Sequence, residues 1–307
     1  MLKKFIPFIF VLLWSTGFIG TKLGLFYASA GDFLTLRSLA NVAIFIVLLL
    51  IFKQNKLNKV QIFHAMVTGL LIHCAYLGGV YSAISYGIPA GLTAIIVGLQ
   101  PLLTSILAIF IFHSRLSIIQ WLALVFGLIG LSLVVSGGLS LDNVSAGALV
   151  FTFVALLGIT IGTLYQKRFC QNQPLLPSVC WQYIASLLVF VPMALFDGGQ
   201  PVIWHPEFIA SLVWLVVMLS VVAILLLMYM VEQGDASKVT SYFYLVPPVT
   251  AIQAWLLFDE ALTVQSMMGM LLCAISVYFV IHPKFAKVVI VTQKESEQDE
   301  NSQSTAS

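Results

Sequence analysis

The sequence predicts an all-α integral membrane protein of about ten transmembrane helices, arranged as two inverted five-helix repeats. Three observations lead to this fold class. Hydrophobic residues make up 60% of the chain and charged residues only 8%, whereas an ordinary soluble domain carries about 25% charged residues. Apolar runs long enough to cross a bilayer follow one another with short breaks between them. Basic residues gather in every second break.

The ten expected spans are predominantly apolar runs of about 20 residues, the length that crosses a bilayer. They cover residues 5–27, 32–52, 60–85, 89–112, 117–136, 145–166, 175–196, 208–231, 238–258 and 262–282. The first run lacks a small-residue cleavage site, so we expect it to be retained as a helix. Residues 288–307 are polar and without apolar periodicity, so we expect a disordered tail.

The basic residues predict the orientation. With the N-terminus in the cytoplasm, 12 of the 14 basic residues fall in cytoplasmic segments: Lys3, Lys4, Lys53, Lys56, Lys59, Arg115, Lys167, Arg168, Lys238, Lys284, Lys287 and Lys294. A wrong span count would destroy this pattern. We therefore expect a multi-pass protein of the plasma (inner) membrane with both termini cytoplasmic.

The two halves of the chain resemble each other. Residues 90–101 align with residues 236–247, an offset of 146 positions, and residues 19–21 align with 161–163. We expect a first repeat over residues 1–137 and a second over 138–287. Because each repeat holds five spans, the second enters the membrane upside down. Inverted repeats of this kind are typical of secondary transporters, whose substrate site lies near the midplane between the halves.

Several function classes find no support in the sequence. The net charge of +2 and the lack of a basic patch give no reason to expect a nucleic-acid partner. No metal-ligand spacing and no phosphate-binding G-x-x-x-x-G-K-[ST] motif occurs, so we expect no metal, no cofactor and no ATP drive. The sequence holds no cluster of acid–base residues, so we expect no enzyme and no catalytic residue. The expected partners are the lipid bilayer and a small-molecule substrate, with the chain a monomer or a homodimer.

Two basic residues, Lys22 and Arg37, lie inside expected spans. Charges at such depth are costly and usually face a cavity or a partner. One interpretation is an anion-binding pair for the substrate. The alternatives are that Lys22 extends to the headgroups and that Arg37 pairs with helix-end carbonyls or Asp32. No acidic residue lies deep in any expected span, which favours a substrate with an anionic group over a lipophilic cation.

Further polar and aromatic residues are expected to line the substrate cavity. His73 falls near the middle of the third span, with Tyr76 on the same face. A histidine there either exchanges a proton during transport or is a neutral group hydrogen-bonded between helices. The remaining candidates are Gln100, Tyr242, Tyr244 and Trp14.

Two prolines, Pro101 and Pro247, occupy equivalent places in spans four and nine. Each removes a backbone donor and should kink its helix near mid-membrane. We interpret them as hinges that line the cavity; the alternative is a kink used only for packing.

Five stretches of the sequence resemble EamA-type members of the drug/metabolite transporter superfamily. They are Leu13–Gly24 (LWSTGFIGTKLG), Leu34–Arg37 (LTLR), Tyr76–Val80 (YLGGV), Pro89–Ala94 (PAGLTA) and Phe258–Thr263 (FDEALT). The resemblance covers nearly the whole chain except the tail. One departure is Ser114, where the family usually carries a Glu, so the acidic turn is kept only in the second repeat.

The resemblance implies a ten-helix, two-repeat carrier with a central cavity. Together with the in-span cations, it leads us to expect a secondary-active transporter that exports amino acids or related anionic or zwitterionic metabolites by alternating access. The first alternative is an exporter of lipophilic cations from the same superfamily. A membrane enzyme acting on lipid-linked substrates is a weaker alternative.

Overall fold

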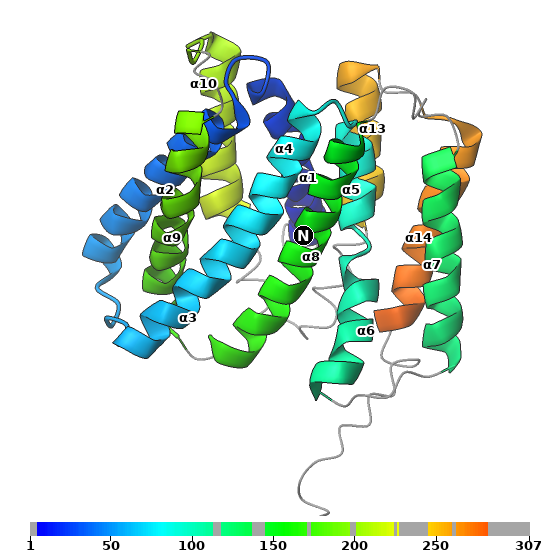
Figure 1. The fold of residues 1–307 in the computed structure, drawn as a ribbon, viewed down its shortest axis with the longest axis horizontal. Helices are drawn as coiled ribbons and strands as arrows, with labels where there is room; N and C mark the ends of the chain where they lie inside the picture. Colours follow the sequence, from blue (N-terminus) through cyan, green and yellow to red (C-terminus); the bar gives the residue numbers. More distant parts are fainter. Residues whose placement is uncertain are drawn as a thin grey trace, which may run out of the picture.

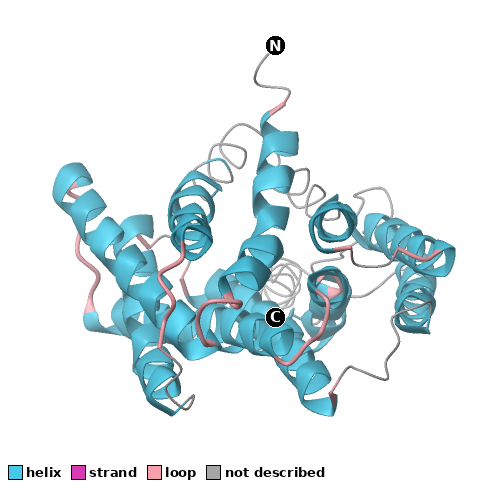
Figure 2. Ribbon diagram, turned by 90° about the horizontal axis from the view of Figure 1, so that it is seen from above, coloured by secondary structure: helices cyan, strands magenta, loops and turns pink. Residues whose placement is uncertain are grey.

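The computed structural model describes residues 5–112, 118–136, 145–170, 173–196, 201–223, 226, 245–259 and 262–281. Within these residues the chain forms helices joined by loops, and Figure 2 draws no strand among them. Six helical segments are long and apolar enough to cross a membrane, and four shorter apolar helices accompany them. Every one of the ten expected spans contains a described helix. The predicted all-α membrane fold is therefore confirmed.

The first half of the chain supplies five spans. Its elements are α1 (Ile6–Gly24), α2 (Ala30–Phe52), α3 (Lys59–Gly69), η2 (Leu70–Gly78), α4 (Gly79–Ser85), α5 (Ala90–Val97), α6 (Gln100–Phe112) and α7 (Ile118–Ser136). The elements α3, η2 and α4 form one continuous third span, in which η2 is a π-helical stretch. The fourth span is α5 followed by α6.

The second half repeats this order. Its elements are α8 (Ala146–Phe169), α9 (Leu175–Phe196), α10 (Pro206–Val213), η4 (Trp214–Ala223), α13 (Val246–Phe258) and α14 (Val264–Ile281). The third span of this half also contains a π-helical stretch, η4. Since π-helices are rare, their occurrence in the third span of both halves is independent support for the internal repeat.

The helix pairing follows a pseudo-two-fold relation between the halves. The second, fourth and fifth spans each pack against their own counterparts: α2 against α9, α5 against α13, and α7 against α14. The first span of each half packs against the third span of the other, so α1 contacts α10 and η4, and α8 contacts η2 and α4. Figure 1 shows α2 beside α9 at one end of the molecule and α7 beside α14 at the other.

Close helix contacts hold the third span against α8. A Cβ atom placed on Gly158 would lie 2.7 Å from the Cβ of Ala75, and one on Gly162 would lie 2.6 Å from Cγ1 of Ile72. Real side chains do not approach so closely, so glycine is required at both positions. The Gly158-x-x-x-Gly162 pattern thus lets the backbones of α8 and η2 meet, as small residues do between membrane helices.

The described loops define two sides of the bundle. The lysine-rich side holds Lys53, Lys56, Lys167 and Arg168, and the lysine-poor side holds residues 25–29, 86–89 and 201–205. On the lysine-poor side, Ser29 caps α2 by accepting a hydrogen bond from the backbone of Asp32 at 3.1 Å. On the same side, α13 ends at Phe258, and Asp259 follows in the left-handed conformation, as expected for a residue that terminates a helix.

Candidate functional site

Arg37 lies on α2 in the interior of the bundle and is only 6% exposed. Its Nη1 donates a hydrogen bond to the hydroxyl of Tyr81 on α4, at 3.0 Å. Its Nε makes no hydrogen bond within the described part of the chain. A buried guanidinium with five donors is costly unless those donors are paired, and Tyr81 pairs with only one of them. Arg37 therefore has donor capacity that a buried anion would use.

Asn41 lies one turn beyond Arg37 on the same face of α2 and is fully buried. Neither its amide nitrogen nor its amide oxygen has a hydrogen-bond partner among the described residues. Buried polar groups are nearly always hydrogen-bonded in folded proteins. A fully buried amide without protein partners beside a buried arginine is therefore typical of a site that binds a polar ligand or water.

His73 lies on η2 and is 8% exposed. Its ring stacks on that of Tyr183 from α9, with the ring centroids 4.2 Å apart and an interplanar angle of 24°. Neither ring nitrogen makes a hydrogen bond within the described residues, although Gln182 approaches the ring. Tyr183 is held in place by the bond from its hydroxyl to Ser220 on η4, at 3.1 Å.

These groups form one buried polar cluster at the boundary between the two repeats. The side chains of Tyr76, Tyr81, Tyr183 and His73 all lie near the guanidinium of Arg37. The first repeat contributes α2, η2 and α4, and the second contributes α9 and η4. The hydroxyl of Ser186 on α9 also donates to that of Ser38 on α2 at 3.0 Å, which fixes the two helices against each other. We call Arg37, Asn41, His73, Tyr76, Tyr81 and Tyr183 the Arg37 cluster.

The structure thus brings together three of the residues predicted from sequence: Arg37, His73 and Tyr76. Sequence reasoning missed Asn41, Tyr81 and Tyr183. A signal for Asn41 was present, because it is an amide one helical turn from Arg37 within an apolar run. The two tyrosines gave no such signal, since only the fold shows which of the ten tyrosines face the arginine.

Other predicted site residues lie in different surroundings. The ammonium of Lys22 lies 4.0 Å from the ring centroid of Phe258 on α13. Gln100 donates from Nε2 to the hydroxyl of Thr163 on α8, at 3.3 Å. Trp14 is half-buried and its ring lies 5.4 Å from that of Phe10. The remaining predicted pair, Tyr242 and Tyr244, lies outside the described residues.

The two predicted hinge prolines lie at helix beginnings. The break in the fourth span comes just before Pro101, because α5 ends at Val97 and α6 begins at Gln100. Pro247 lies in the first turn of α13, where a missing backbone donor costs little. A Cβ atom on Gly98, in the break, would collide with the ring of Pro247. The helix break of the first repeat therefore packs directly on the proline of the second.

A cavity of about 480 Å³ lies beside the Arg37 cluster, toward the lysine-poor side. Its lining includes Cys74, Gly78 and Ser82 from the third span, Phe151 from α8 and Phe190 from α9. In the sequence, Cys74 follows His73 and Ser82 follows Tyr81, so the cavity and the cluster occupy adjacent faces of one helix. No group of three or more metal-ligating side chains occurs among the described residues.

Comparison with known protein families divides the chain into the same two halves. A model of the EamA-like transporter family matches twice, at residues 5–136 and 146–282. A relative from Bacillus subtilis (strain 168), the uncharacterized transporter YvbV, is 22% identical over 271 residues and covers 88% of each chain. A probable amino-acid metabolite efflux pump of Salmonella typhimurium (strain LT2) is 24% identical over 285 residues, which are 89% of this chain and 93% of that one.

A solved crystal structure shares the fold. It superposes with a TM-score of 0.61 at 17% sequence identity and covers 89% of this chain and 94% of its own. At this identity the likeness concerns the fold alone. The multiple apolar helices and the transporter relatives together identify a multi-pass membrane protein. Because the family model covers both halves of the chain, the protein belongs to the EamA-like transporter family.

Proposed function

We propose that this protein is a secondary-active transporter that exports an amino acid or a related small anionic or zwitterionic metabolite by alternating access. The observation that carries the proposal is Arg37, a buried cation at the boundary between the repeats. Its only described hydrogen bond goes to Tyr81, and it forms no ion pair with any described carboxylate. A substrate carboxylate would complete its pairing.

The surroundings of Arg37 support a substrate with further polar atoms. Asn41 offers both a donor and an acceptor, and each nitrogen of His73 offers one or the other. These groups converge with Arg37 from two helices of the first repeat, while Tyr183 faces them from the second. A ligand held between groups of both repeats lies where a rocking motion of the halves would expose it to each side in turn.

The comparisons support the transporter class and agree with this substrate class. One relative is named a probable amino-acid metabolite efflux pump. The lysine-rich side, which holds Lys53, Lys56, Lys167 and Arg168, supports a cytoplasmic assignment of that side. We therefore place the protein in the plasma (inner) membrane with the lysine-poor side external.

The decisive test is flux in proteoliposomes that contain the purified full chain. The panel holds labelled neutral amino acids and one lipophilic cation, with and without a pH gradient. Saturable amino-acid flux that is lost in Arg37→Ala would support the proposal. Flux of the cation alone, or equal amino-acid flux in wild type and Arg37→Ala, would overturn it.

A further inference from the structure

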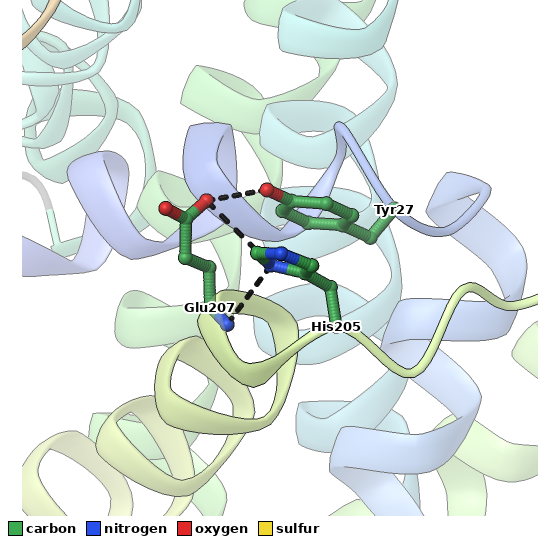
Figure 3. A network of polar contacts seen from close by, with 3 residues as sticks. All are labelled: Tyr27, His205 and Glu207. Atoms are coloured by element: carbon green, nitrogen blue, oxygen red, sulfur yellow. Dashed lines mark hydrogen bonds and ion pairs between the residues drawn. The ribbon is translucent and has the colours of Figure 1, made fainter.

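A second polar group lies apart from the Arg37 cluster, on the lysine-poor side, and joins the two repeats (Figure 3). Tyr27, from the loop between α1 and α2, donates a hydrogen bond from its hydroxyl to Oε2 of Glu207 on α10. The Tyr27 ring also stacks on that of His205, with ring centroids 4.7 Å apart and an interplanar angle of 7°. Tyr27 belongs to the first repeat, and His205 and Glu207 belong to the second.

The group lies at the end of a longer seam between α1 and α10. The backbone N–H of Ile203 donates to the carbonyl of Tyr27 at 2.8 Å. Deeper in the bundle, the hydroxyl of Ser211 donates to the carbonyl of Gly20 at 2.6 Å. These contacts tie the first repeat to the second from the loops toward the interior. Opening this side of the carrier by rocking the repeats apart would have to break or displace the bonds at the rim.

The Nδ1 atom of His205 can either accept a hydrogen bond or, when protonated, donate one. Its Nδ1 accepts the backbone N–H of Glu207 at 3.3 Å and thereby caps α10, which requires an unprotonated Nδ1. The same Nδ1 lies 3.9 Å from Oε2 of Glu207. Protonation would turn Nδ1 into a donor directed at that carboxylate, and the carboxylate would then bind both His205 and Tyr27.

The bond between His205 and Glu207 lies within the second repeat, so it orders this polar group but does not by itself join the repeats. A protonated His205 would also place a positive charge against the face of the Tyr27 ring, whose centroid lies 4.7 Å from that of the imidazole, and a cation is attracted to an aromatic face. This contact crosses from the second repeat to the first.

Among the described residues, the titratable groups that face His205 are Tyr27 and Glu207. Tyr27 faces it from the α1–α2 loop and Glu207 from α10, while Asp32 at the start of α2 accepts a hydrogen bond from Ser29 at 2.8 Å. The hydrogen bond to Glu207 raises the pKa of Tyr27 above its ordinary value, so this phenol stays a donor throughout the range in which histidines titrate.

We propose that Tyr27, His205 and Glu207 form a latch that holds the lysine-poor side of the carrier closed, and that protonation of His205 tightens it. The inference rests on alternating access in the proposed function, but not on the identity of the substrate. Between about pH 8 and pH 5.5 histidines gain a proton while most carboxylates stay ionised. The latch is therefore tighter at the acid end of this range. The pair is partly exposed, at 46% and 60% for its side chains, so the effect is modest.

Three substitutions separate the parts of the latch. His205→Asn keeps a side chain that caps a helix well but cannot take up a proton. Tyr27→Phe keeps the stacked ring and removes the hydroxyl. Glu207→Gln keeps an acceptor for Tyr27 and removes the charge. Each change is small and lies at a partly or largely exposed position, so each variant is expected to fold.

The measurement is the distance between two nitroxide labels by dipolar electron paramagnetic resonance, which needs no substrate. The labels go on Phe26→Cys and Pro201→Cys, exposed positions in the two loops, in a full chain whose four native cysteines are replaced. In reconstituted wild type we expect the ratio of the short to the long distance population to rise roughly two- to five-fold from pH 8 to pH 5.5. In His205→Asn the ratio should not change with pH.

Tyr27→Phe and Glu207→Gln should lower the short-distance population at both pH values. The proposal is overturned if the ratio of the two distance populations in the wild type does not change with pH, or if it changes equally in His205→Asn. It is also overturned if Glu207→Gln has the same distance populations as the wild type. Because this readout is independent of substrate, a failed flux assay with an intact pH response would count against the proposed substrate and not against the latch.

Discussion

Arg37 and Tyr81 form a buried pair, in which the guanidinium Nη1 donates to the tyrosine hydroxyl across 3.0 Å. Both side chains are buried, and they come from the second and third spans of the same repeat. Tyr81 orients the arginine without neutralising it, because a phenol is uncharged at neutral pH. The charge of Arg37 thus remains available within the bundle, while its direction is fixed.

Replacing Arg37 with alanine should abolish most transport. The variant loses a charge-assisted hydrogen bond to the substrate, so we expect kcat/KM to fall roughly 10- to 100-fold. Tyr81→Phe keeps the charge and loses only its orientation, so its loss should be smaller. Both are measured as substrate-dependent flux at matched protein incorporation. A normal KM in Arg37→Ala would show that the arginine is structural.

His73→Phe tests whether the imidazole nitrogens contribute to function. Phenylalanine preserves an aromatic ring that can stack on Tyr183 but offers no donor or acceptor. We expect the melting temperature in detergent to stay close to that of the wild type while substrate flux falls at least about tenfold. Equal flux in the two proteins would mean that His73 serves only for packing.

Lys22→Gln should leave the KM for substrate unchanged. The ammonium of Lys22 lies over the ring of Phe258, 4.0 Å from its centroid, and so contacts α13. Loss of this cation–π contact is expected to cost about 0.5–1 kcal/mol of stability. The same flux assay measures the KM, with Arg37→Ala as the comparison. A KM raised as strongly as in Arg37→Ala would instead place Lys22 in the substrate site.

Gly98→Ala should destabilise the protein, because the added methyl group would collide with the ring of Pro247. Overpacking of this kind typically costs about 1–3 kcal/mol, which a thermal unfolding experiment in detergent would detect as a lower melting temperature. Gly147→Ala is the matched control, since a Cβ atom there would meet only the hydroxyl of Ser145, at 3.8 Å. Equal melting temperatures for the two variants would contradict the close contact.

The fold could be predicted from the sequence because a helix that crosses a bilayer needs about 20 mainly apolar residues, and because basic residues gather on the cytoplasmic side. Span length and the alternation of lysine-rich breaks are read directly from the order of apolar and basic residues, and the ten expected spans all contain described helices. The span limits also predicted that Arg37 and His73 lie within the membrane, with His73 near the middle of its span and Arg37 in the outer half of its own. Their burial in one cluster agrees with that expectation.

The partners of these residues could not be predicted in the same way. Tyr183 lies 110 positions after His73 in the sequence, and only the packing of α9 on η2 brings the two rings together. The place of the helix break beside Pro101 has a local reason. A proline is tolerated in the first turn of a helix, so Pro101 marks the start of α6, and the break falls on the residues before it.

The π-helical stretch Leu70–Gly78 has a consequence for the angular phase of the third span. A π-turn takes up one residue more than an α-turn, and one residue corresponds to about 100° of rotation about an α-helix. Winding this stretch back to α geometry would rotate the residues beyond it about the helix axis and carry Tyr81 away from Arg37, to which its hydroxyl is hydrogen-bonded. The counterpart in the second half, Trp214–Ala223, has the same property. A change between π and α geometry in the third span of either repeat would therefore alter which side chains face the interior.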